Sequence, residues 1–379
     1  MRVALSGWFC DRPDTGSGQY LRQLLGRMAA LEDVPELVVL APPEHLEGQA
    51  ALSDVQFLPL EAPDGAWGKV WWEQVVLPNA VRLLQVDLLH VPYWAPPFFS
   101  PCPTVVTVHD LIPLLLPAYR GPAAVRLYTS LVSRASRRAA LLLTDSEASR
   151  ADILQHLALP PAQVRAVPLA VDARYTPDPV PDDARRRQAL GLRSGYVLYL
   201  GGFDVRKNLS AVFGAFARAQ QAGDDGSLVI AGRLPAQDGA FTPDPRRLAR
   251  EAGLPVALVK FTGFVPEAHT PALYRGARVF LYPSRYEGFG LPPLEALSCG
   301  VPVVGSNAAS LPEVVGDGGV LVAPDDVVAL GAALRCLLTD AAFHAAASER
   351  ALQQAARFSW ETTVAQTLAA YREVLRGDV

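Results

Sequence analysis

Short apolar runs alternate with segments of helical spacing along most of the chain, and this pattern limits the folds that the chain can adopt. The apolar runs are continuous, which is typical of parallel strands covered by helices on both faces. These strand candidates are 2–7, 36–42, 88–94, 104–110 and 141–146 in the first half, and 196–201, 228–232, 259–264, 278–284, 301–306 and 319–324 in the second. Helices fit between them, for example at 208–221 and 326–339. This rhythm predicts an α/β protein with a doubly wound sheet in each half.

A change of composition near the middle separates the two halves. Prolines and charged residues crowd the segment 171–187, where the apolar periodicity stops, as expected of a linker. We therefore predict Rossmann-like domains over 1–172 and 195–358, joined by a linker over 173–194, with a terminal helix within 359–379. Open α/β sheets bind ligands outside the carboxyl ends of their strands, so two such domains with facing strand ends would form a deep cleft.

Composition excludes several classes of protein. The formal net charge is −4, so no overall basic surface indicates a nucleic-acid partner. The four cysteines are scattered without a Cys-x-x-Cys pair, which predicts a reduced, cytoplasmic protein with small buried thiols. The first apolar run is too short for a signal peptide. No segment approaches the roughly 18 to 20 apolar residues of a membrane span.

The segment 199–213, YLGGFDVRKNLSAVF, predicts a strand, a glycine turn and a helix that Asn208 or Ser210 would cap. Arg206 and Lys207 stand at the helix start, where the helix dipole is already positive. This placement is explained if an anion binds there, because the dipole, the guanidinium and the ammonium would all point at it. The alternative is a solvated turn that carries two charges.

The segment 285–304, RYEGFGLPPLEALSCGVPVV, places Glu287 and Glu295 on either side of a glycine- and proline-rich break. The prolines suit the first turn of a helix, and Gly288 and Gly290 would let the backbone approach a ligand. We expect Glu287 in the exit loop of a strand and Glu295 one turn into the helix. The pair could be the acid and nucleophile of a glycosidase, a metal site, two ligands of one substrate, or two unrelated surface charges.

Two features of the first half also lie at predicted strand ends. The segment 14–25, DTGSGQYLRQLL, places Gly16 and Gly18 at a helix start, a backbone suited to anions but also simply a turn. Position 21 is leucine, so no Gly-x-Gly-x-x-Gly fingerprint is complete, which counts against a dinucleotide oxidoreductase. His109 ends the strand candidate 104–110, and it is either a packed core residue or a functional one.

The segment between Leu111 and Thr144 has no acidic residue but has arginines at 120, 126, 134, 137 and 138. A helix is predicted over Pro122–Arg138, with most of these arginines near one face. The segment 120–138 would then lie on an anionic membrane, or it would be an ordinary sheet-covering helix with a solvated basic face.

These motifs together resemble the retaining glycosyltransferases of family 4, which have the GT-B fold. The stretch EGFGLPPLE matches that family's E-x7-E signature, and residues 299–326 follow it as they do in the family. The stretch GGFDVRKN resembles the family's phosphate-binding loop, and TGSGQYLRQL its N-terminal glycine loop. The stretches VHDLIPLLLP and WWEQVVLP are most similar to bacterial mannosyltransferase-type members. The resemblance covers nearly the whole chain and implies that the terminal helix crosses back to the first domain.

The resemblance also implies roles for the candidate residues. Glu295 would bind the donor's ribose, and Glu287 the hydroxyls of its sugar. Arg206 and Lys207 would neutralise the diphosphate. The remaining donor contacts would come from Gly16, Gly18, Gly288, Phe289, Gly290 and Leu291 near the sugar and phosphates, from His109 against the transferred sugar, and from Phe264 and Val265 beside the base. Many members have arginine where this chain has Gly202, so the diphosphate charge would rest on Arg206 and Lys207.

The two glutamates are then expected to be two ligands of one nucleotide-sugar donor. A nucleoside diphosphate is a good leaving group that needs charge stabilisation more than a proton, whereas glycosidase carboxylates must flank a glycosidic bond. The chain has no Asp-x-Asp, so neither a metal nor another cofactor is expected. By resemblance, the donor is GDP-mannose and the acceptor a glycan or lipid-linked hydroxyl. The alternatives are a nucleotide-sugar epimerase of the same fold and a non-catalytic nucleotide-sugar-binding module.

Overall fold

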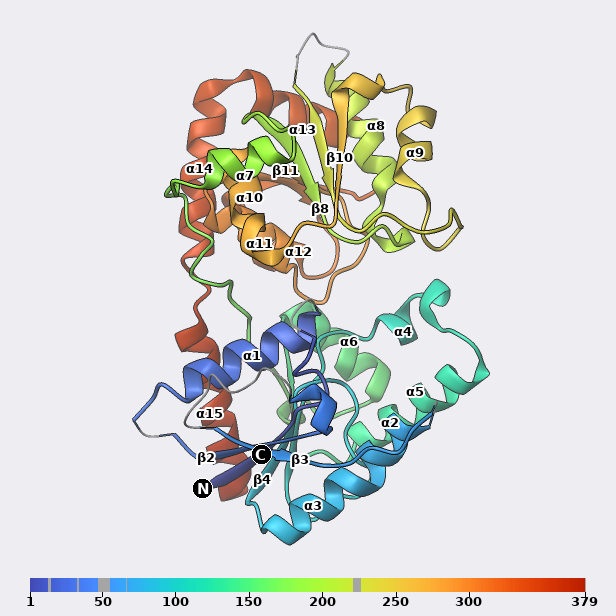
Figure 1. Cartoon of the computed structure of the whole chain (residues 1–379), viewed down its shortest axis with the longest axis vertical. Coiled ribbons are helices and arrows are strands. Elements are labelled where there is room, and N and C mark those ends of the chain that lie inside the picture. Colours follow the sequence, from blue (N-terminus) through green and yellow to red (C-terminus); the bar gives the residue numbers. More distant parts are fainter. Residues whose placement is uncertain (13–14, 33, 47–54, 66, 221–225, 379) are drawn as a thin grey trace. The chain divides into compact units, whose positions relative to one another are not determined.

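The computed structural model describes residues 1–12, 15–32, 34–46, 55–65, 67–220 and 226–378. The chain forms two compact units. The first unit contains Met1–Leu169 and Ser359–Val379, and the second contains Ala170–Phe358. Each unit is an α/β domain built on one parallel sheet with helices on both faces, which confirms the predicted fold class (Figure 1).

The sheet of the first unit has seven parallel strands in the order β3-β2-β1-β4-β5-β6-β7. The strands are β1 (Arg2–Ser6), β2 (Glu36–Ala41), β3 (Gln56–Pro59), β4 (Leu88–Val91), β5 (Thr104–Thr107), β6 (Leu141–Thr144) and β7 (Val164–Ala166). The strand order reverses between β1 and β4, the kind of position where doubly wound sheets bind ligands. The sequence did not indicate β3 or β7, the two edge strands.

Helices pack on this sheet and complete the first unit. They are α1 (Gly16–Met28), α2 (Gly68–Trp71), α3 (Leu77–Leu84), α4 (Ile112–Leu115), α5 (Ala123–Ser136), α6 (Glu147–Leu157) and α15 (Trp360–Arg376), and a π-helical turn over Trp72–Val76 joins α2 to α3. Two clusters of buried side chains lie side by side on one face of the sheet, one with Trp72 and Leu77 and the other with Ile153 and Leu157.

The terminal helix α15 belongs to the first unit. It starts after Ser359, whose side-chain oxygen accepts the N–H of Thr362, and it ends at Gly377 in the left-handed region. It lies beside α1 (Figure 1), where the side chain of Arg27 contacts Glu361 at 3.1 Å. The chain therefore returns to its first unit through α15.

The sheet of the second unit has six parallel strands in the order β10-β9-β8-β11-β12-β13. The strands are β8 (Tyr196–Leu200), β9 (Leu228–Ala231), β10 (Val259–Gly263), β11 (Ala277–Tyr282), β12 (Val303–Ser306) and β13 (Gly319–Val322). The helices are α7 (Asp183–Ala189), α8 (Leu209–Gln220), α9 (Pro245–Glu251), α10 (Thr270–Gly276), α11 (Leu291–Ser298), α12 (Leu311–Val315), α13 (Val327–Thr339) and α14 (Ala341–Ala355). The order reverses between β8 and β11.

Three sequence-based expectations need correction. The segment expected as a linker, 173–194, contains α7, and the buried Asp183 at its start contacts the guanidinium of Arg275 at 2.6 and 2.8 Å. Its charged residues are thus partly fixed by ion pairs within the second unit. The cysteines are not uniformly buried, because only Cys299 is buried and Cys336 is exposed. Asn208 does not cap α8 in the expected way, because it adopts the left-handed region and its amide nitrogen donates to the carbonyls of Pro283 and Pro324.

Within the described part of the chain, no single helix is long and apolar enough to cross a membrane. One bent pair, Val327–Thr339 with Ala341–Arg376, meets the requirements of length and composition only when its members are taken together.

Candidate active site

In the second unit, the loops after β8 and β11 carry most of the candidate residues. These two strands are parallel neighbours, so both loops leave the same edge of the sheet at the point where the strand order reverses. The loop after β8 carries Gly202, Arg206 and Lys207, and the loop after β11 carries Glu287. The parallel sheet thereby brings together residues that are 80 positions apart in the sequence.

Arg206 and Lys207 both bind the carboxylate of Glu287. The Nζ atom of Lys207 lies 2.8 Å from Oε1 of Glu287, and a guanidinium nitrogen of Arg206 lies 2.6 Å from Oε2. The hydroxyl of Tyr282, the last residue of β11, accepts from Lys207 at 2.6 Å and donates to Glu287 at 3.0 Å. Lys207 and Glu287 are 9% and 7% exposed, so this is a buried, hydrogen-bonded charge cluster.

The burial of these groups changes their pKa values in different directions. Burial alone would raise the pKa of Glu287, but Lys207 and Arg206 lower it to about 2. Burial lowers the pKa of Lys207, although Glu287 opposes that change. The pKa of Arg206 is raised, because Glu287 and Asp204 outweigh its burial. Glu287 is therefore a carboxylate at neutral pH, and it offsets part of the positive charge that the sequence indicated.

Glu295 lies in α11 and belongs to a separate hydrogen-bonded group. The hydroxyl of Tyr274 donates to its carboxylate at 2.8 Å, and Tyr175 also interacts with it. Burial raises the pKa of Glu295 to about 7, although the two tyrosines act in the opposite direction. The two glutamates thus differ in charge near neutral pH, since Glu287 is fully ionised whereas Glu295 titrates.

The glycine-rich loop before α11 has the geometry that the sequence predicted. Glu287 lies in the loop, and Gly290, with φ of 117°, occupies the position immediately before the helix. A side chain at Gly290 would be strained and would meet Leu311 at 3.0 Å. The hydroxyl of the buried Ser310 lies within hydrogen-bonding distance of the carbonyl oxygens of Glu287 and Phe289 and holds the loop in place.

Two further candidates lie after β10, the edge strand of the same sheet. The ring of Phe264 is 54% exposed and lies under the guanidinium of Arg233, 5.1 Å from its centre. Val265 is buried. Of these two side chains, Phe264 is therefore the one that offers an exposed flat surface to a ligand.

Gly202 lies in the loop after β8. It is exposed, and its carbonyl accepts a hydrogen bond from Tyr199.

In the first unit, Gly16 and Gly18 form the first turn of α1. The hydroxyl of Thr15 accepts the N–H of Gly18 at 3.2 Å, so this amide already has a partner. A Cβ at Gly18 would lie 1.9 Å from the carbonyl oxygen of Arg12, whereas one at Gly16 would meet nothing within 4 Å. A side chain at position 18 would therefore clash with the backbone of the preceding loop, so this position requires glycine. A side chain at Gly16, the first residue of α1, would have free space around its Cβ.

His109 follows β5 and pairs with an aspartate that sequence analysis missed. Its Nδ1 atom lies 2.8 Å from the carboxylate of the buried Asp145, which directly follows β6, and the ring packs edge-on against Tyr20. Burial alone would lower the pKa of His109, but Asp145, with a smaller contribution from Asp110, raises it above its usual value. Asp145 thereby fixes the ring of His109 and favours its protonated form.

A second buried polar group joins α15 to this sheet. His90 in β4 is fully buried, with Tyr371 at 2.6 Å from Nδ1 and Thr107 at 2.9 Å from Nε2. Thr107 in turn donates to Tyr20 at 3.2 Å. Burial lowers the pKa of His90 to about 3, so it is neutral, and its role is to attach the terminal helix.

Three side chains of these groups, Tyr282, Asp145 and Tyr274, were not predicted from the sequence. Tyr282 and Asp145 stand at the ends of apolar strand candidates that the sequence did identify, so their position was a usable signal. Tyr274 lies in α10, a short helix with no motif around it, and only the structure places it beside Glu295.

Comparisons with known proteins agree with this architecture. The family described as Glycosyltransferase Family 4 matches residues 15–175, and Glycosyl transferases group 1 matches residues 182–355. The O-antigen chain mannosyltransferase B of Escherichia coli is 32% identical over 373 residues, which cover 95% of this chain and 96% of that protein. The serotype-specific mannosyltransferase WbdA of E. coli is 32% identical over 73% of this chain, but that match covers only 34% of WbdA.

Among solved structures, Anabaena HepE in complex with UDP and glucose has a TM-score of 0.76 and 20% identity. The match covers 98% of this chain and 99% of that one. At this identity the likeness supports the fold alone.

Proposed function

Because the chain belongs to glycosyltransferase family 4, we propose that it transfers a hexose from a nucleoside-diphosphate sugar to an acceptor hydroxyl. The observation that carries this proposal is the buried cluster of Arg206, Lys207 and Glu287 at the reversal of the strand order. Two cations held at a strand end suit the diphosphate of such a donor.

We propose that Arg206 and Lys207 stabilise the charge that develops on the departing diphosphate. Because the leaving group is already good, this electrostatic stabilisation is worth more than a proton donor. Glu287 would hold the two cations in place and accept hydroxyls of the donor sugar with its remaining lone pairs, while Glu295 would accept the ribose hydroxyls. The backbone of Gly288, Phe289, Gly290 and Leu291 would contact sugar and diphosphate, with Gly202 near the phosphates and Phe264 and Val265 beside the base.

The proposal extends to the candidate residues of the first unit. Gly16 and Gly18 would approach the donor phosphates through the start of α1, and His109 would contact the transferred sugar. Asp145 would act only through His109, as a positioning residue.

The reaction would proceed with retention of the anomeric configuration. We favour attack of the acceptor on the same face from which the diphosphate leaves, so that an oxygen of the diphosphate takes the acceptor's proton. The bond from the anomeric carbon to the diphosphate breaks as the bond to the acceptor oxygen forms. No metal is required in this scheme, since Arg206, Lys207 and backbone amides supply the positive charge.

We propose GDP-mannose as the donor. The support comes from the names of the E. coli relatives, both of which are mannosyltransferases, and from this chain's match to almost the full length of one of them. UDP-glucose is the main competitor, because the Anabaena structure is a complex with UDP and glucose.

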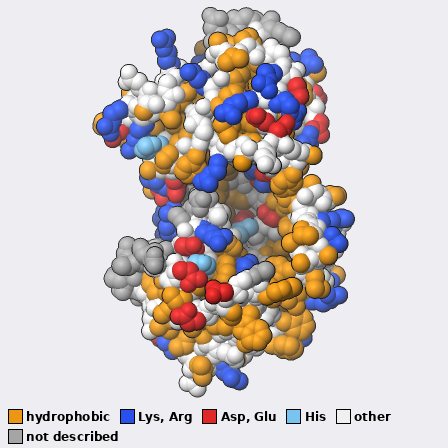
Figure 2. Space-filling model, turned by 45° about the vertical axis from the view of Figure 1, so that its right-hand side comes forward, with side chains coloured by type: hydrophobic (Ala, Val, Ile, Leu, Met, Phe, Trp, Pro, Cys, Tyr) orange, Lys and Arg blue, Asp and Glu red, His pale blue; other side chains and the backbone are white. Residues whose placement is uncertain are grey.

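The acceptor would be a glycan or lipid-linked hydroxyl, with the enzyme acting in the cytoplasm at the inner face of the membrane. Segment 120–138 supports a peripheral membrane contact, because Val125 and Leu127 are exposed beside its arginines. Trp67 and Trp71 are also exposed around α2, which a hydrogen bond from Lys69 to Tyr128 joins to α5. Hydrophobic side chains at the surface of this unit are visible in Figure 2. Exposed tryptophans and basic side chains are both common at membrane interfaces.

A panel of nucleotide-sugars tests the proposed function. Thermal stabilisation and slow hydrolysis without acceptor are measured for each donor, and GDP-mannose is expected to score highest in both. Lys207→Ala serves as the variant with a damaged donor site, and Lys260→Ala, an exposed lysine of the same unit, is the matched control. Conversion of a nucleotide-sugar without release of nucleoside diphosphate would identify an epimerase instead. Binding of a donor with neither hydrolysis nor transfer would indicate a binding module.

A further inference from the structure

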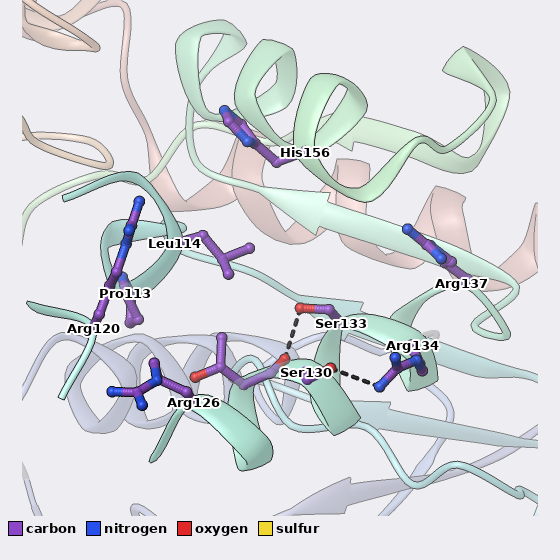
Figure 3. Close-up of a pocket in the computed structure, with 10 residues that line it drawn as sticks. Pro113, Leu114, Arg120, Arg126, Ser130, Ser133, Arg134, Arg137 and His156 are labelled. Carbon is purple, nitrogen blue, oxygen red and sulfur yellow. Dashed lines mark hydrogen bonds between the residues drawn. The ribbon is translucent and has the colours of Figure 1, made fainter. Parts of the chain in front are cut away.

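A cavity of about 400 Å³ in the first unit lies outside the candidate donor site. It is bounded by α5 on one side, by α6 on the other, and by α4 with the segment that follows it (Figure 3). Four arginines and a histidine are among its ten lining residues, and none of the ten is acidic. Figure 3 shows Arg120 and Arg126 at one end, Arg134 and Arg137 at the other, and His156 opposite α5.

The positive charge of this cavity is not neutralised by carboxylates. Arg126 donates to the carbonyl of Gly121, Arg134 to the hydroxyl of Ser130 at 2.6 Å, and Arg137 to the carbonyl of Leu157. These partners are all uncharged. Within the described part of the chain, none of the four cavity arginines forms an ion pair with a carboxylate.

All four arginines are exposed to solvent, and an anion bound between them would lower their mutual repulsion. Like charges in one concavity repel each other, and the chain as a whole is acidic, with a net charge of −4, so carboxylates were available to balance them. By contrast, Arg247 and Arg275 in the second unit each contact an aspartate. In the described part of the chain, Arg82 and Arg193 also form no ion pair, so what distinguishes the cavity is that four such arginines share one concavity.

The donors of the cavity match phosphate oxygens. A guanidinium has five N–H groups in a planar fork that binds phosphate in pairs, and the neutral partners of Arg126, Arg134 and Arg137 engage only part of each fork. Ser130 accepts from Arg134, so its own hydroxyl proton remains available for an anion. The volume lies within the roughly 300 to 1,000 Å³ of small-molecule sites and exceeds what one phosphate group needs.

We propose that this cavity binds a phosphate or diphosphate group, and that this group belongs to the acceptor. The proposal rests on the proposed transfer of a hexose to an acceptor hydroxyl, and it assigns the acceptor's class as a glycan that ends in a phosphate or diphosphate ester. That ester has two possible sources, a lipid-linked glycan or a soluble sugar phosphate. Either would be recognised by the same four arginines.

The binding experiment titrates inorganic pyrophosphate into the full chain. The donor site is blocked with saturating nucleoside diphosphate, so that heat from added pyrophosphate reports the cavity. Arg126→Gln/Arg134→Gln is expected to weaken pyrophosphate binding by on the order of 10²-fold, about tenfold for each lost charge-assisted contact. Arg82→Gln/Arg193→Gln, which removes two exposed arginines outside the cavity, should leave binding unchanged.

Several controls keep the proposal falsifiable. Unchanged affinity for the nucleoside diphosphate shows that Arg126→Gln/Arg134→Gln is folded. If this variant does not fold, Arg120→Gln/Arg137→Gln is used in its place. Arg126→Lys/Arg134→Lys should restore part of the affinity, because lysine keeps the charge but not the fork. Equal pyrophosphate affinity in the cavity variant and its control would overturn the proposal.

A second pair of measurements separates the sources of the phosphate. Transfer is compared for a lipid-linked glycan diphosphate, a soluble glycan phosphate and a phosphate-free glycan. The cavity variant should raise KM at least tenfold for the phosphate-bearing acceptors only.

Loss of binding to anionic vesicles with pyrophosphate binding intact would assign these arginines to the membrane surface and overturn the proposal. If no donor is turned over, the proposed transfer fails, whereas the pyrophosphate titration still decides the cavity.

Discussion

Replacing Lys207 by methionine should destabilise the second unit measurably, because it leaves Glu287 buried with only one of its two cations. Arg206 and Lys207 lower the pKa of Glu287 to about 2 from an ordinary value of 4.5. That difference of roughly 2.5 pKa units corresponds to about 3 kcal/mol at neutral pH. Because the folded-state pKa is the lower one, this stability is present above pH 4.5 and is lost as the pH falls through 2. We expect Lys207→Met to cost about 3 kcal/mol, since one partner of a buried ion pair is removed.

The six tryptophans allow the two units to be followed separately. Trp8, Trp67, Trp71, Trp72, Trp94 and Trp360 all lie in the first unit. Urea unfolding followed by tryptophan fluorescence therefore reports the first unit, and far-ultraviolet circular dichroism reports both. The second unit contributes to the circular dichroism transition but not to the fluorescence transition. At pH 7, Lys207→Met should lower the urea midpoint of this second-unit contribution, and Lys260→Met should leave it unchanged.

A double-mutant cycle tests the physical cause. In a Glu287→Gln background the same Lys207→Met change should cost at least about 1.5 kcal/mol less, since no buried carboxylate is left without its partner. A cost below about 1 kcal/mol for Lys207→Met in the wild type, or an equal cost in both backgrounds, would exclude the unpaired carboxylate as the cause of the destabilisation.

Four other perturbations, of the candidate donor site and of His109, have defined expected outcomes. The pKa of Glu295 is raised to about 7, so the folded state binds more protons than the unfolded state between pH 4.5 and 7. The melting temperature should therefore fall as the pH is raised from 4.5 to 7. In Glu295→Gln this pH dependence of the melting temperature should be weaker. Arg206→Ala and Lys207→Ala should each lower kcat for transfer by on the order of 10²-fold, and near-normal values would remove the diphosphate assignment. Transfer should persist in excess chelator, whereas abolition with rescue by a divalent ion would show a metal requirement. In Asp145→Asn, the pKa of His109 measured by NMR titration should decrease, and an unchanged value would exclude Asp145 as its cause.

The regular parts of both units were predictable because parallel strands buried on both faces are continuous apolar runs. Strands β8 and β11 and the loops after them follow directly from that pattern. Strand β3 was missed because it lies at the sheet edge, where none of its four residues is fully buried. Strand β7 has only three residues, too few for any periodicity to be visible. The arginines of α7 indicated a linker because Arg186 and Arg187 donate to the carbonyls of Ala268 and Ala272, which lie more than 80 positions along the chain.

Much of the candidate donor site also followed from the sequence, but its charge balance did not. The positions of Glu287 in a loop and Glu295 in a helix were predictable from the glycines and prolines around them. The ion pairs of Glu287 depend on the register of β8 against β11, which brings together residues separated by 80 positions. The raised pKa of Glu295 depends on burial and on Tyr274, neither of which a motif records.

Glycosyl transfer can be followed in an NMR time course of the purified protein with GDP-mannose and a phosphate-bearing glycan. We expect the anomeric proton signal of the donor to disappear while free GDP and a mannoside of the same anomeric configuration appear in equal amounts. A product of opposite configuration would contradict retention. Absence of nucleoside diphosphate release with every donor and acceptor tested would contradict glycosyl transfer itself.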